Sequence, residues 1–166
     1  MLVYHPAYDA YHCVFRSMLI TEYVKVVEVA KLRILDFFLC FPAEIQRVRL
    51  PREHKEAKKI AQGVSNQYHG PVSMHQAFRD MEHIQLAAFR TLVASRLVAS
   101  DEYETGLVRR TDVVVPEELR ISLMKASDTD RIVVEYIVKK LASIPLLGND
   151  GLKHRTGLME HRYDVA

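Results

Sequence analysis

One segment, residues 21–41, restricts the possible folds of this chain most strongly. Its charged residues fall on one side of a helical wheel and its apolar residues fill the rest: Val24, Val26, Val27, Val29, Ala30, Leu32, Ile34, Leu35, Phe37, Phe38 and Leu39. This pattern predicts a long, mostly buried helix. The β-branched residues near its start also suit a strand, but they do not alternate strictly with polar ones. Pro42 ends the helix, because proline disfavours helical geometry in the residue before it.

The rest of the chain can supply the core that such a helix needs. With 166 residues, 49% hydrophobic and 27% charged, the composition is typical of one folded soluble domain. The longest apolar run, residues 37–41, is five residues long, whereas a membrane span needs about 20. We therefore expect no membrane association. Cys13 and Cys40 make no disulfide framework, and no secretory segment follows Met1, so we expect a cytoplasmic protein.

Cap and turn residues predict the order of the elements. Asp9 is an expected N-cap of a short first helix, and Ser73, with Gln76, caps a helix that runs to Leu92 and breaks near residues 80–81. Residues 107–116 predict a strand or small hairpin. Pro116 starts a further helix, and a last strong helix begins at Asp128 or Thr129 and stops before Pro145.

These elements predict a mainly α fold with a small β wing. The expected architecture is a winged-helix-like three-helix core with additional C-terminal helices, in which residues 86–98 take the recognition position and residues 107–116 form the wing. The predicted domain covers residues 1–145. Residues 146–166 are expected to be an irregular tail.

Two segments carry opposite charge. Residues 47–59 hold six basic residues against two acidic ones, Glu53 and Glu56; the basic residues are Arg47, Arg49, Arg52, Lys55, Lys58 and Lys59. This excess could bind a few phosphates of nucleic acid, although a solvated helix face explains it equally well. Residues 101–118 hold six acidic residues against Arg109 and Arg110. An acidic wing flank favours a protein partner over DNA.

The N-terminus is rich in aromatic residues. Tyr4, Tyr8, Tyr11 and Phe15 are spaced four, three and four residues apart and would form one stripe if helical. Tyrosine is enriched at protein interfaces, where one side of the ring is buried and the other is wet. The stripe therefore predicts either packing on the protein's own core or a protein interface. We assign Arg109 and Arg110 to the same interface.

Catalytic and metal-binding patterns are weak. Asp9 with His12, and His75 with Glu82 and His83, have helical spacing, but the close histidine pairs typical of zinc sites are missing from the sequence. The cysteines lie among apolar residues, where burial raises a thiol pKa and lowers its reactivity. We therefore expect a protein that is not an enzyme, with no catalytic residue, no cofactor and no metal.

Two stretches carry a family resemblance. Residues 4–16, which read YHPAYDAYHCVFR, and residues 32–42, which read LRILDFFLCFP, resemble the small middle component of ABC-three-component systems, the prokaryotic defence operons that include Lamassu. The resemblance implies a non-enzymatic accessory subunit between an SMC-like ABC ATPase and a separate effector, often a nuclease. The complex responds to phage or plasmid DNA, and the subunit is likened to the winged-helix and kleisin-type partners of SMC ATPases. The resemblance offers no catalytic residue to carry over.

Three hypotheses follow from the sequence. The first is the adaptor that the resemblance implies, with the aromatic stripe or wing flank as protein interface and residues 47–59 in contact with double-stranded DNA. The second is a dimeric winged-helix transcriptional regulator that reads DNA through residues 86–98, although that segment has only Arg90 and Arg96 as bases. The third is a small metal-dependent or thiol enzyme.

Overall fold

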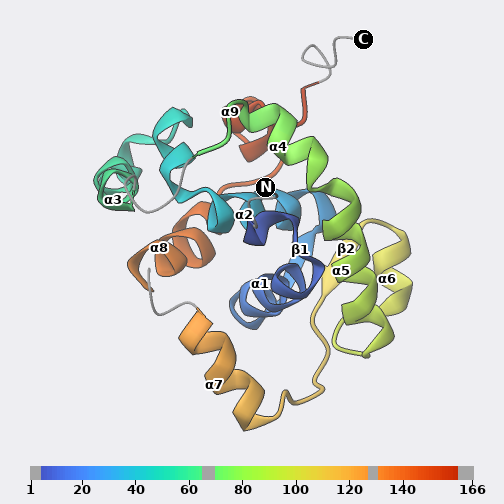
Figure 1. Ribbon diagram of the computed structural model, residues 1–166. Coiled ribbons are helices and arrows are strands. Elements are labelled where there is room, and N and C mark those ends of the chain that lie inside the picture. Colours follow the sequence, from blue (N-terminus) through green and yellow to red (C-terminus); the bar gives the residue numbers. More distant parts are fainter. Residues whose placement is uncertain (1–4, 65–69, 127–130, 161–166) are drawn as a thin grey trace.

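A computed structural model describes residues 5–64, 70–126 and 131–160 of the chain. Helices surround a central helix, α2, and a two-stranded sheet lies beside it (Figure 1). The elements before residue 65 are η1 (Pro6–Tyr8), α1 (Ala10–Tyr23), β1 (Val26–Glu28), α2 (Val29–Cys40), η2 (Pro42–Arg47), η3 (Arg52–His54) and α3 (Glu56–Val64), where η marks 3-10 or π-helical turns.

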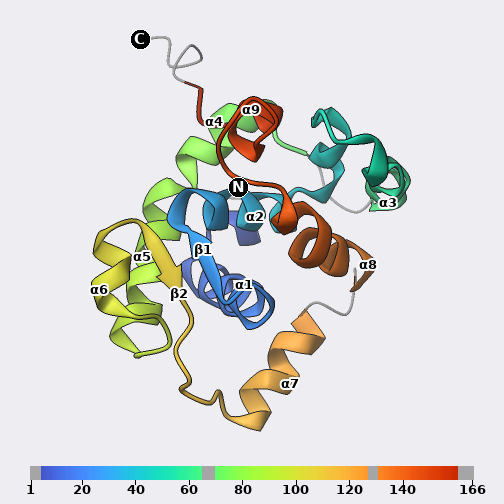
Figure 2. The ribbon, with the colours of Figure 1, turned by 180° about the vertical axis from the view of Figure 1, so that it is seen from behind.

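The second half of the chain adds helices on three sides of α2, as the two opposite views show (Figures 1 and 2). Its elements are α4 (Met74–Asp80), α5 (Glu82–Ala94), α6 (Ser100–Glu104), β2 (Leu107–Arg109), α7 (Glu117–Ala126), α8 (Arg131–Glu135), η5 (Tyr136–Lys140), η6 (Leu141–Ser143) and α9 (Leu152–Thr156). The prediction of a mainly α fold with a small β element is confirmed. The winged-helix arrangement is not confirmed.

Helix α2 forms the centre of the core. All of its residues from 31 to 38 are buried, and the Phe37 ring packs edge-on against Phe38 and Phe78 at centroid distances of 5.2 and 6.0 Å. The polar side of the predicted wheel is buried as well, because Lys31, Arg33 and Asp36 lie inside the protein. A charged side chain at such a position needs a partner. The partners of Arg33 and Asp36 lie on the neighbouring helices and connect them to this central helix.

The predicted single helix over residues 21–41 is wrong in its first part. Helix α1 continues to Tyr23, the chain then extends through β1, and α2 begins only at Val29. Val24, Val26 and Val27 have β-branched side chains that suit extended geometry. They adopt it because β2, far along the chain, offers a pairing edge. The end of the helix at Phe41 and Pro42 is confirmed.

The sheet joins two distant segments. Strand β1 pairs antiparallel with β2 in the register Val26↔Arg109, Val27↔Val108 and Glu28↔Leu107, and an isolated bridge links Val98 to Arg110. Val27 and Val108 point into the core. The predicted strand is thus present for residues 107–109, and its partner is β1 rather than a second strand within residues 107–116.

Several local predictions are confirmed. The Asp9 side chain accepts a hydrogen bond from the His12 backbone at 3.0 Å, and the Ser73 hydroxyl accepts one from the Gln76 backbone at 3.3 Å. The Gln76 side chain contacts Asp80 and Arg79 instead of closing a capping box. The predicted break near residues 80–81 separates α4 from α5.

The C-terminal third agrees with the prediction up to Pro145. Helix α7 follows Pro116 directly, and the last long helical segment, α8 to η6, ends at Ser143. Its expected start at Asp128 or Thr129 lies outside the described residues. The boundary at residue 145 stays a prediction, but residues 146–160 are not irregular throughout, since they include α9 and the buried residues Leu146, Leu152 and Leu158. Among the described helices, none combines the length and apolarity that a membrane crossing requires.

Candidate interaction surfaces

The structure divides the predicted aromatic stripe between two elements. Tyr4 lies outside the described residues, Tyr8 belongs to η1, and Tyr11 and Phe15 lie one turn apart on α1 with ring centroids 4.5 Å apart. The division arises because Asp9 caps α1 one residue after Tyr8. Burial and the nearby carboxylate of Asp80 raise the pKa of the Tyr8 phenol.

Helix α1 carries an apolar face that includes two of the predicted residues. Tyr11, Val14, Phe15 and Met18 have the spacing i, i+3, i+4 and i+7, which places them on one side of a helix. Tyr11 is 68% exposed, Val14 and Phe15 are half-buried, and Met18 is buried. The face thus runs from an exposed ring at the helix start to the edge of the core. We call these four residues the α1 face.

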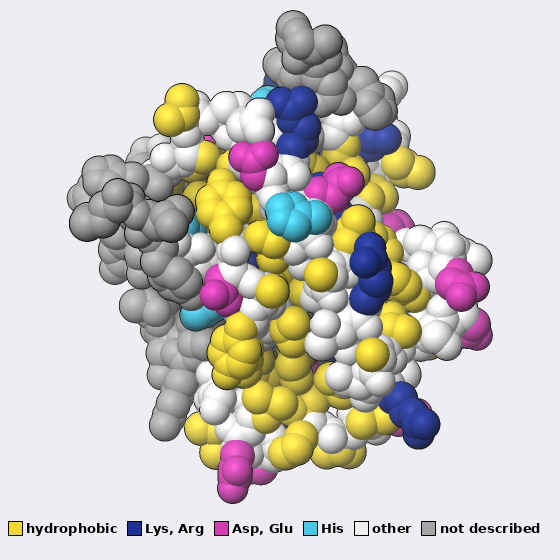
Figure 3. Space-filling model, turned by 45° about the vertical axis from the view of Figure 1, so that its right-hand side comes forward, with side chains coloured by type: hydrophobic (Ala, Val, Ile, Leu, Met, Phe, Trp, Pro, Cys, Tyr) yellow, Lys and Arg dark blue, Asp and Glu magenta, His cyan; other side chains and the backbone are white. Residues whose placement is uncertain are grey.

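The α1 face leads into an apolar groove. The groove has a volume of about 310 Å³ and lies between α1, the end of α5 and residues 113–119. Nine of its ten lining residues are apolar, and Val14, Met18, Val113 and Val114 are among them. Val114 is 86% exposed. Figure 3 shows hydrophobic side chains running together down the lower part of this side of the molecule, with charged ones mostly at its margins.

Arg110 holds the outer wall of the groove in place. Its guanidinium donates hydrogen bonds to the carbonyl oxygens of Thr111 and Val113, both at 2.8 Å, and to that of Leu97 at 3.4 Å. It also pairs with Glu22 of α1 at 2.9 Å, and its side chain is only 6% exposed. These bonds hold residues 111–113 in position, and the assignment of Arg110 to a protein interface stays a prediction.

Arg109 faces the other side of β2 and is half exposed. Its Nε atom lies 2.7 Å from the carboxylate of Glu102 on α6. Alternation along the strand explains the contrast, because successive side chains point to opposite faces of a sheet. Arg109 therefore remains available at the surface, next to the acidic residues of α6.

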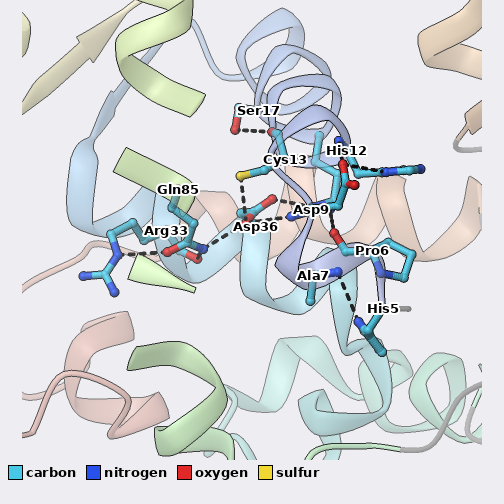
Figure 4. Close-up of polar contacts among 11 residues, drawn as sticks. His5, Pro6, Ala7, Asp9, His12, Cys13, Ser17, Arg33, Asp36 and Gln85 are labelled. Atoms are coloured by element: carbon cyan, nitrogen blue, oxygen red, sulfur yellow. Dashed lines mark hydrogen bonds and ion pairs between the residues drawn. The ribbon is translucent and has the colours of Figure 1, made fainter. Parts of the chain in front are cut away.

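A buried polar network connects α1, α2 and α5 (Figure 4). Its centre is Asp36, which is fully buried. The Asp36 carboxylate accepts hydrogen bonds from Arg16 of α1 at 2.6 Å and from the Gln85 amide of α5 at 2.9 Å. Arg16 also donates to the Pro6 carbonyl, which ties η1 to the same network. Burial lowers the pKa of the Arg16 guanidinium, but the charge and hydrogen bond of Asp36 together with Cys40 and Cys13 raise it above its ordinary value.

A second arginine extends this network toward the surface. Arg33 donates to the Gln85 side-chain oxygen at 2.9 Å, stacks on the Phe78 ring at 4.3 Å, and pairs with Glu82 at 3.0 Å. Within this network Arg16, Asp36 and Arg33 each have an opposite charge or a hydrogen-bond partner, as buried ions require. The network fixes how three helices pack, and with them the position of the α1 face.

Both cysteine thiols are held in the protonated form. Burial, together with the carboxylate of Asp36, raises the pKa of Cys13 to about 12, and the same causes raise the pKa of Cys40 well above its ordinary value. The Cys13 thiol lies 3.7 Å from Asp36. Neutral thiols of this kind are poor nucleophiles at neutral pH.

The candidate metal ligands have other contacts. The Asp9 carboxylate lies 3.0 Å from the His12 ring, within a capped helix start. The His75 ring contacts the Gly157 carbonyl at 3.0 Å and so links α4 to the segment after α9. Across residues 5–64, 70–126 and 131–160, the structure contains no cluster of three or more ligating side chains suited to a metal ion.

The six basic residues of segment 47–59 are all exposed. Arg47 belongs to η2 and pairs with Glu44 at 3.3 Å, while Lys58 and Lys59 lie on α3. Glu56 pairs with Lys140 of η5. The structure also brings a second basic segment to Arg49, because the guanidinium of Arg155 on α9 donates to the Arg49 carbonyl. Sequence reasoning missed this proximity, since residues 146–166 were expected to be irregular.

Comparison with known proteins places the chain in one family. The family model for the ABC-three component (ABC-3C) system Middle Component 5 matches residues 2–164, and the chain belongs to this family. The resemblance seen in residues 4–16 and 32–42 is thereby confirmed at the level of the ABC-three-component middle components. Neither a curated protein nor a solved structure matches the chain.

Proposed function

We propose that this middle component is a non-catalytic accessory subunit of a Lamassu-type defence system. In this proposal it connects an SMC-like ABC ATPase to a nuclease effector in the cytoplasm and contacts double-stranded DNA when phage or plasmid DNA is present. The α1 face and the adjoining groove are the docking surface, and segment 47–59 is the DNA contact. The family membership supports the role in a defence complex, and the surfaces support the proposed contacts with the ATPase and DNA.

The observation that carries the proposal is the continuous apolar surface formed by the α1 face and the groove. It combines an exposed aromatic pair, Tyr11 and Phe15, with a hollow lined almost entirely by apolar side chains. Binding energy in interfaces concentrates in aromatic residues beside well-packed pockets. The Asp36 network anchors α1, and Arg110 anchors residues 111–113 through hydrogen bonds. A preorganised surface loses less entropy on binding than a mobile one.

Opposite charges on the two sides of the molecule support a connecting role. The acidic helix α6 and the basic helix α3 lie on opposite sides in both ribbon views (Figures 1 and 2). Opposed patches steer partners to different faces and fix their orientation. We expect the ATPase to cover the α1 face, while the basic side stays open to DNA.

The transcriptional regulator is the weaker alternative. Helix α5, in the predicted recognition position, packs Gln85, Ala88, Phe89 and Leu92 into the core and ends at Ala94. Arg90 is exposed on it, while Arg96 lies beyond the helix in a left-handed conformation with φ 61°. One arginine on the helix leaves few side chains for base recognition. A sequence-specific shift of a short duplex by the isolated chain would favour this alternative.

Co-purification tests the proposed function. The tagged chain is co-expressed with the ATPase and the effector encoded beside it, and the eluted proteins are identified by mass. We expect the wild type to retain the ATPase, whereas Tyr11→Glu and Val114→Glu lose it because each places a charge in the apolar surface. Arg131→Glu, an exposed change on α8, is the matched control and should retain the ATPase. Elution of the wild-type chain alone would contradict the proposal.

A further inference from the structure

We propose that the basic segment 47–59 continues onto α9 and that the two parts together bind the phosphate backbone of double-stranded DNA. The inference rests on the DNA contact in the proposed function and extends it to a segment far along the chain. We call this surface the composite basic surface; its exposed residues are Arg47, Arg49, Arg52, Lys55, Lys58, Lys59, Lys153 and His154.

Backbone contacts fix the junction of the two parts. The Arg49 backbone amide donates to the Arg155 carbonyl at 3.4 Å, and the Arg155 guanidinium donates in return to the Arg49 carbonyl. The same guanidinium also donates to the Asp150 carbonyl at 2.6 Å. Because a helix rises about 1.5 Å per residue, Lys153 and His154 lie within one turn of this junction. Arg155 is thus a positioning residue that holds α9 beside Arg49.

The charges of the composite basic surface are poorly neutralised. Within the described part of the chain, Arg49, Arg52, Lys55, Lys58, Lys59 and Lys153 make no ion pair. Of the nearby acids, Glu56 pairs with Lys140 and Asp150 pairs with Arg155. Burial raises the pKa of Glu44, the partner of Arg47. Glu53 is exposed within the same segment, but the basic residues outnumber it, so a polyanion would meet a surface of net positive charge.

The side chains of the surface favour a duplex over single strands or a membrane. Single-stranded nucleic acid is bound largely by exposed aromatic rings, but segment 47–59 has no such ring: His54 is buried and lies 2.9 Å from the Tyr136 hydroxyl. Membrane-surface helices insert a free apolar face. On α3 that face is occupied, since Ala57 and Ala61 are fully buried. Charge contacts to a phosphate backbone remain as the fitting mode.

Two neutralising variants and one control test this proposal. The full-length chain is titrated into a labelled 25-base-pair duplex of arbitrary sequence at several salt concentrations, and binding is followed by fluorescence anisotropy. The variants are Lys58→Gln on α3 and Lys153→Gln on α9. The control is Arg120→Gln on α7, which lies at the opposite end of the molecule from α9 (Figure 1). All three side chains are exposed.

We expect both lysine variants to weaken duplex binding by about threefold to fivefold at 100 mM salt and to reduce the salt slope by about one phosphate contact each. Arg120→Gln should bind as the wild type does. Wild-type binding of Lys153→Gln would overturn the inference, as would equal affinity for a single strand, a polyglutamate chain or anionic vesicles. Absence of duplex binding by the wild type at 50 mM salt would also overturn it.

The result is independent of the test for docking. Lys153 lies outside the α1 face and the groove, so the neutralising variants should still co-purify with the ATPase. If the wild-type chain bound the ATPase but not the duplex, this inference alone would be contradicted. If the wild-type chain did not bind the ATPase, the proposed function would be contradicted instead.

Discussion

Cationic residues occupy two contrasting environments in this molecule. Arg16 and Arg33 lie at the contacts of α1, α2 and α5, where Asp36, Gln85 and Glu82 neutralise or solvate them. Arg49, Lys58 and Lys153 lie on the composite basic surface without an acidic partner among the described residues. The first group determines how helices pack, and the second group is open to a ligand.

The buried and the exposed cations differ because burial removes their water. A buried cation loses its water and persists only where fixed partners replace it, so removing one partner is costly. An exposed cation keeps its water and loses little when its neighbours change. Changes to the first group should therefore alter stability, whereas changes to the second should alter binding.

The largest expected effect is on Asp36→Asn. This change leaves Arg16 buried beside a neutral group, and we expect the free energy of unfolding to fall by about 3–5 kcal/mol. Urea unfolding followed by circular dichroism measures it. The control, Asp112→Asn at an exposed position, should stay within about 0.5 kcal/mol of the wild type. A loss below about 1 kcal/mol for Asp36→Asn would break the contrast between buried and exposed charges.

Arg109 and Arg110, adjacent at the end of β2, allow a buried and an exposed arginine to be compared directly. Arg110→Met removes four hydrogen bonds of a side chain that is only 6% exposed and leaves Glu22 paired with Lys25 alone, so we expect a loss of about 2–3 kcal/mol. Arg109→Met removes one exposed ion pair with Glu102 and should cost less than about 1 kcal/mol. If both variants lost the same free energy of unfolding in the same assay, Arg110 would not stabilise residues 111–113.

The Cys13 thiol provides a pH test of the buried network. Its pKa rises from 9.0 to about 12 on folding, so the folded state favours the protonated thiol. This contribution is complete below pH 9 and is lost as the pH rises toward 12. Between pH 8 and pH 10 we expect the wild type to lose about 1 kcal/mol more unfolding free energy than Cys13→Ala does. Parallel pH profiles of the two proteins would contradict burial of this thiol.

The smallest expected effect is on the composite basic surface. Lys58→Gln should change the free energy of unfolding by less than about 0.5 kcal/mol, because the side chain is exposed and makes no ion pair with a described residue. Thermal unfolding of the two proteins side by side measures the difference. If Lys58→Gln were as destabilising as Arg110→Met, Lys58 would support the fold. Exposed and buried cations would then no longer differ in their effect on stability.

Local chemistry made part of the fold predictable. The caps at Asp9 and Ser73, the break between α4 and α5 and the helix start after Pro116 depend on a few neighbouring residues, and the sequence was sufficient for them. Strand β1 was not predictable in this way. Its residues form a strand because residues 107–109 pair with them, and such long-range pairing overrides local helical periodicity.

The candidate surfaces also combine features that local sequence predicts with features that only the folded chain creates. Exposure of the six basic residues of segment 47–59 follows from their charge, and the closeness of Tyr11 and Phe15 follows from helical spacing. The burial of Arg110 depends on carbonyl groups of Leu97, Thr111 and Val113, which only the folded chain brings together. The position of α9, which places Arg155 against Arg49, likewise depends on Leu152 and Leu158 entering the core.

Docking through the α1 face is the central claim, and calorimetric titration of the chain into the ABC ATPase of its own system tests it most directly. We predict saturable binding by the wild type, a Kd at least about tenfold higher for Tyr11→Ala, as for an aromatic interface residue, and an unchanged Kd for Lys58→Gln. Binding of Tyr11→Ala with the wild-type Kd, or no binding by the wild type, would contradict the account.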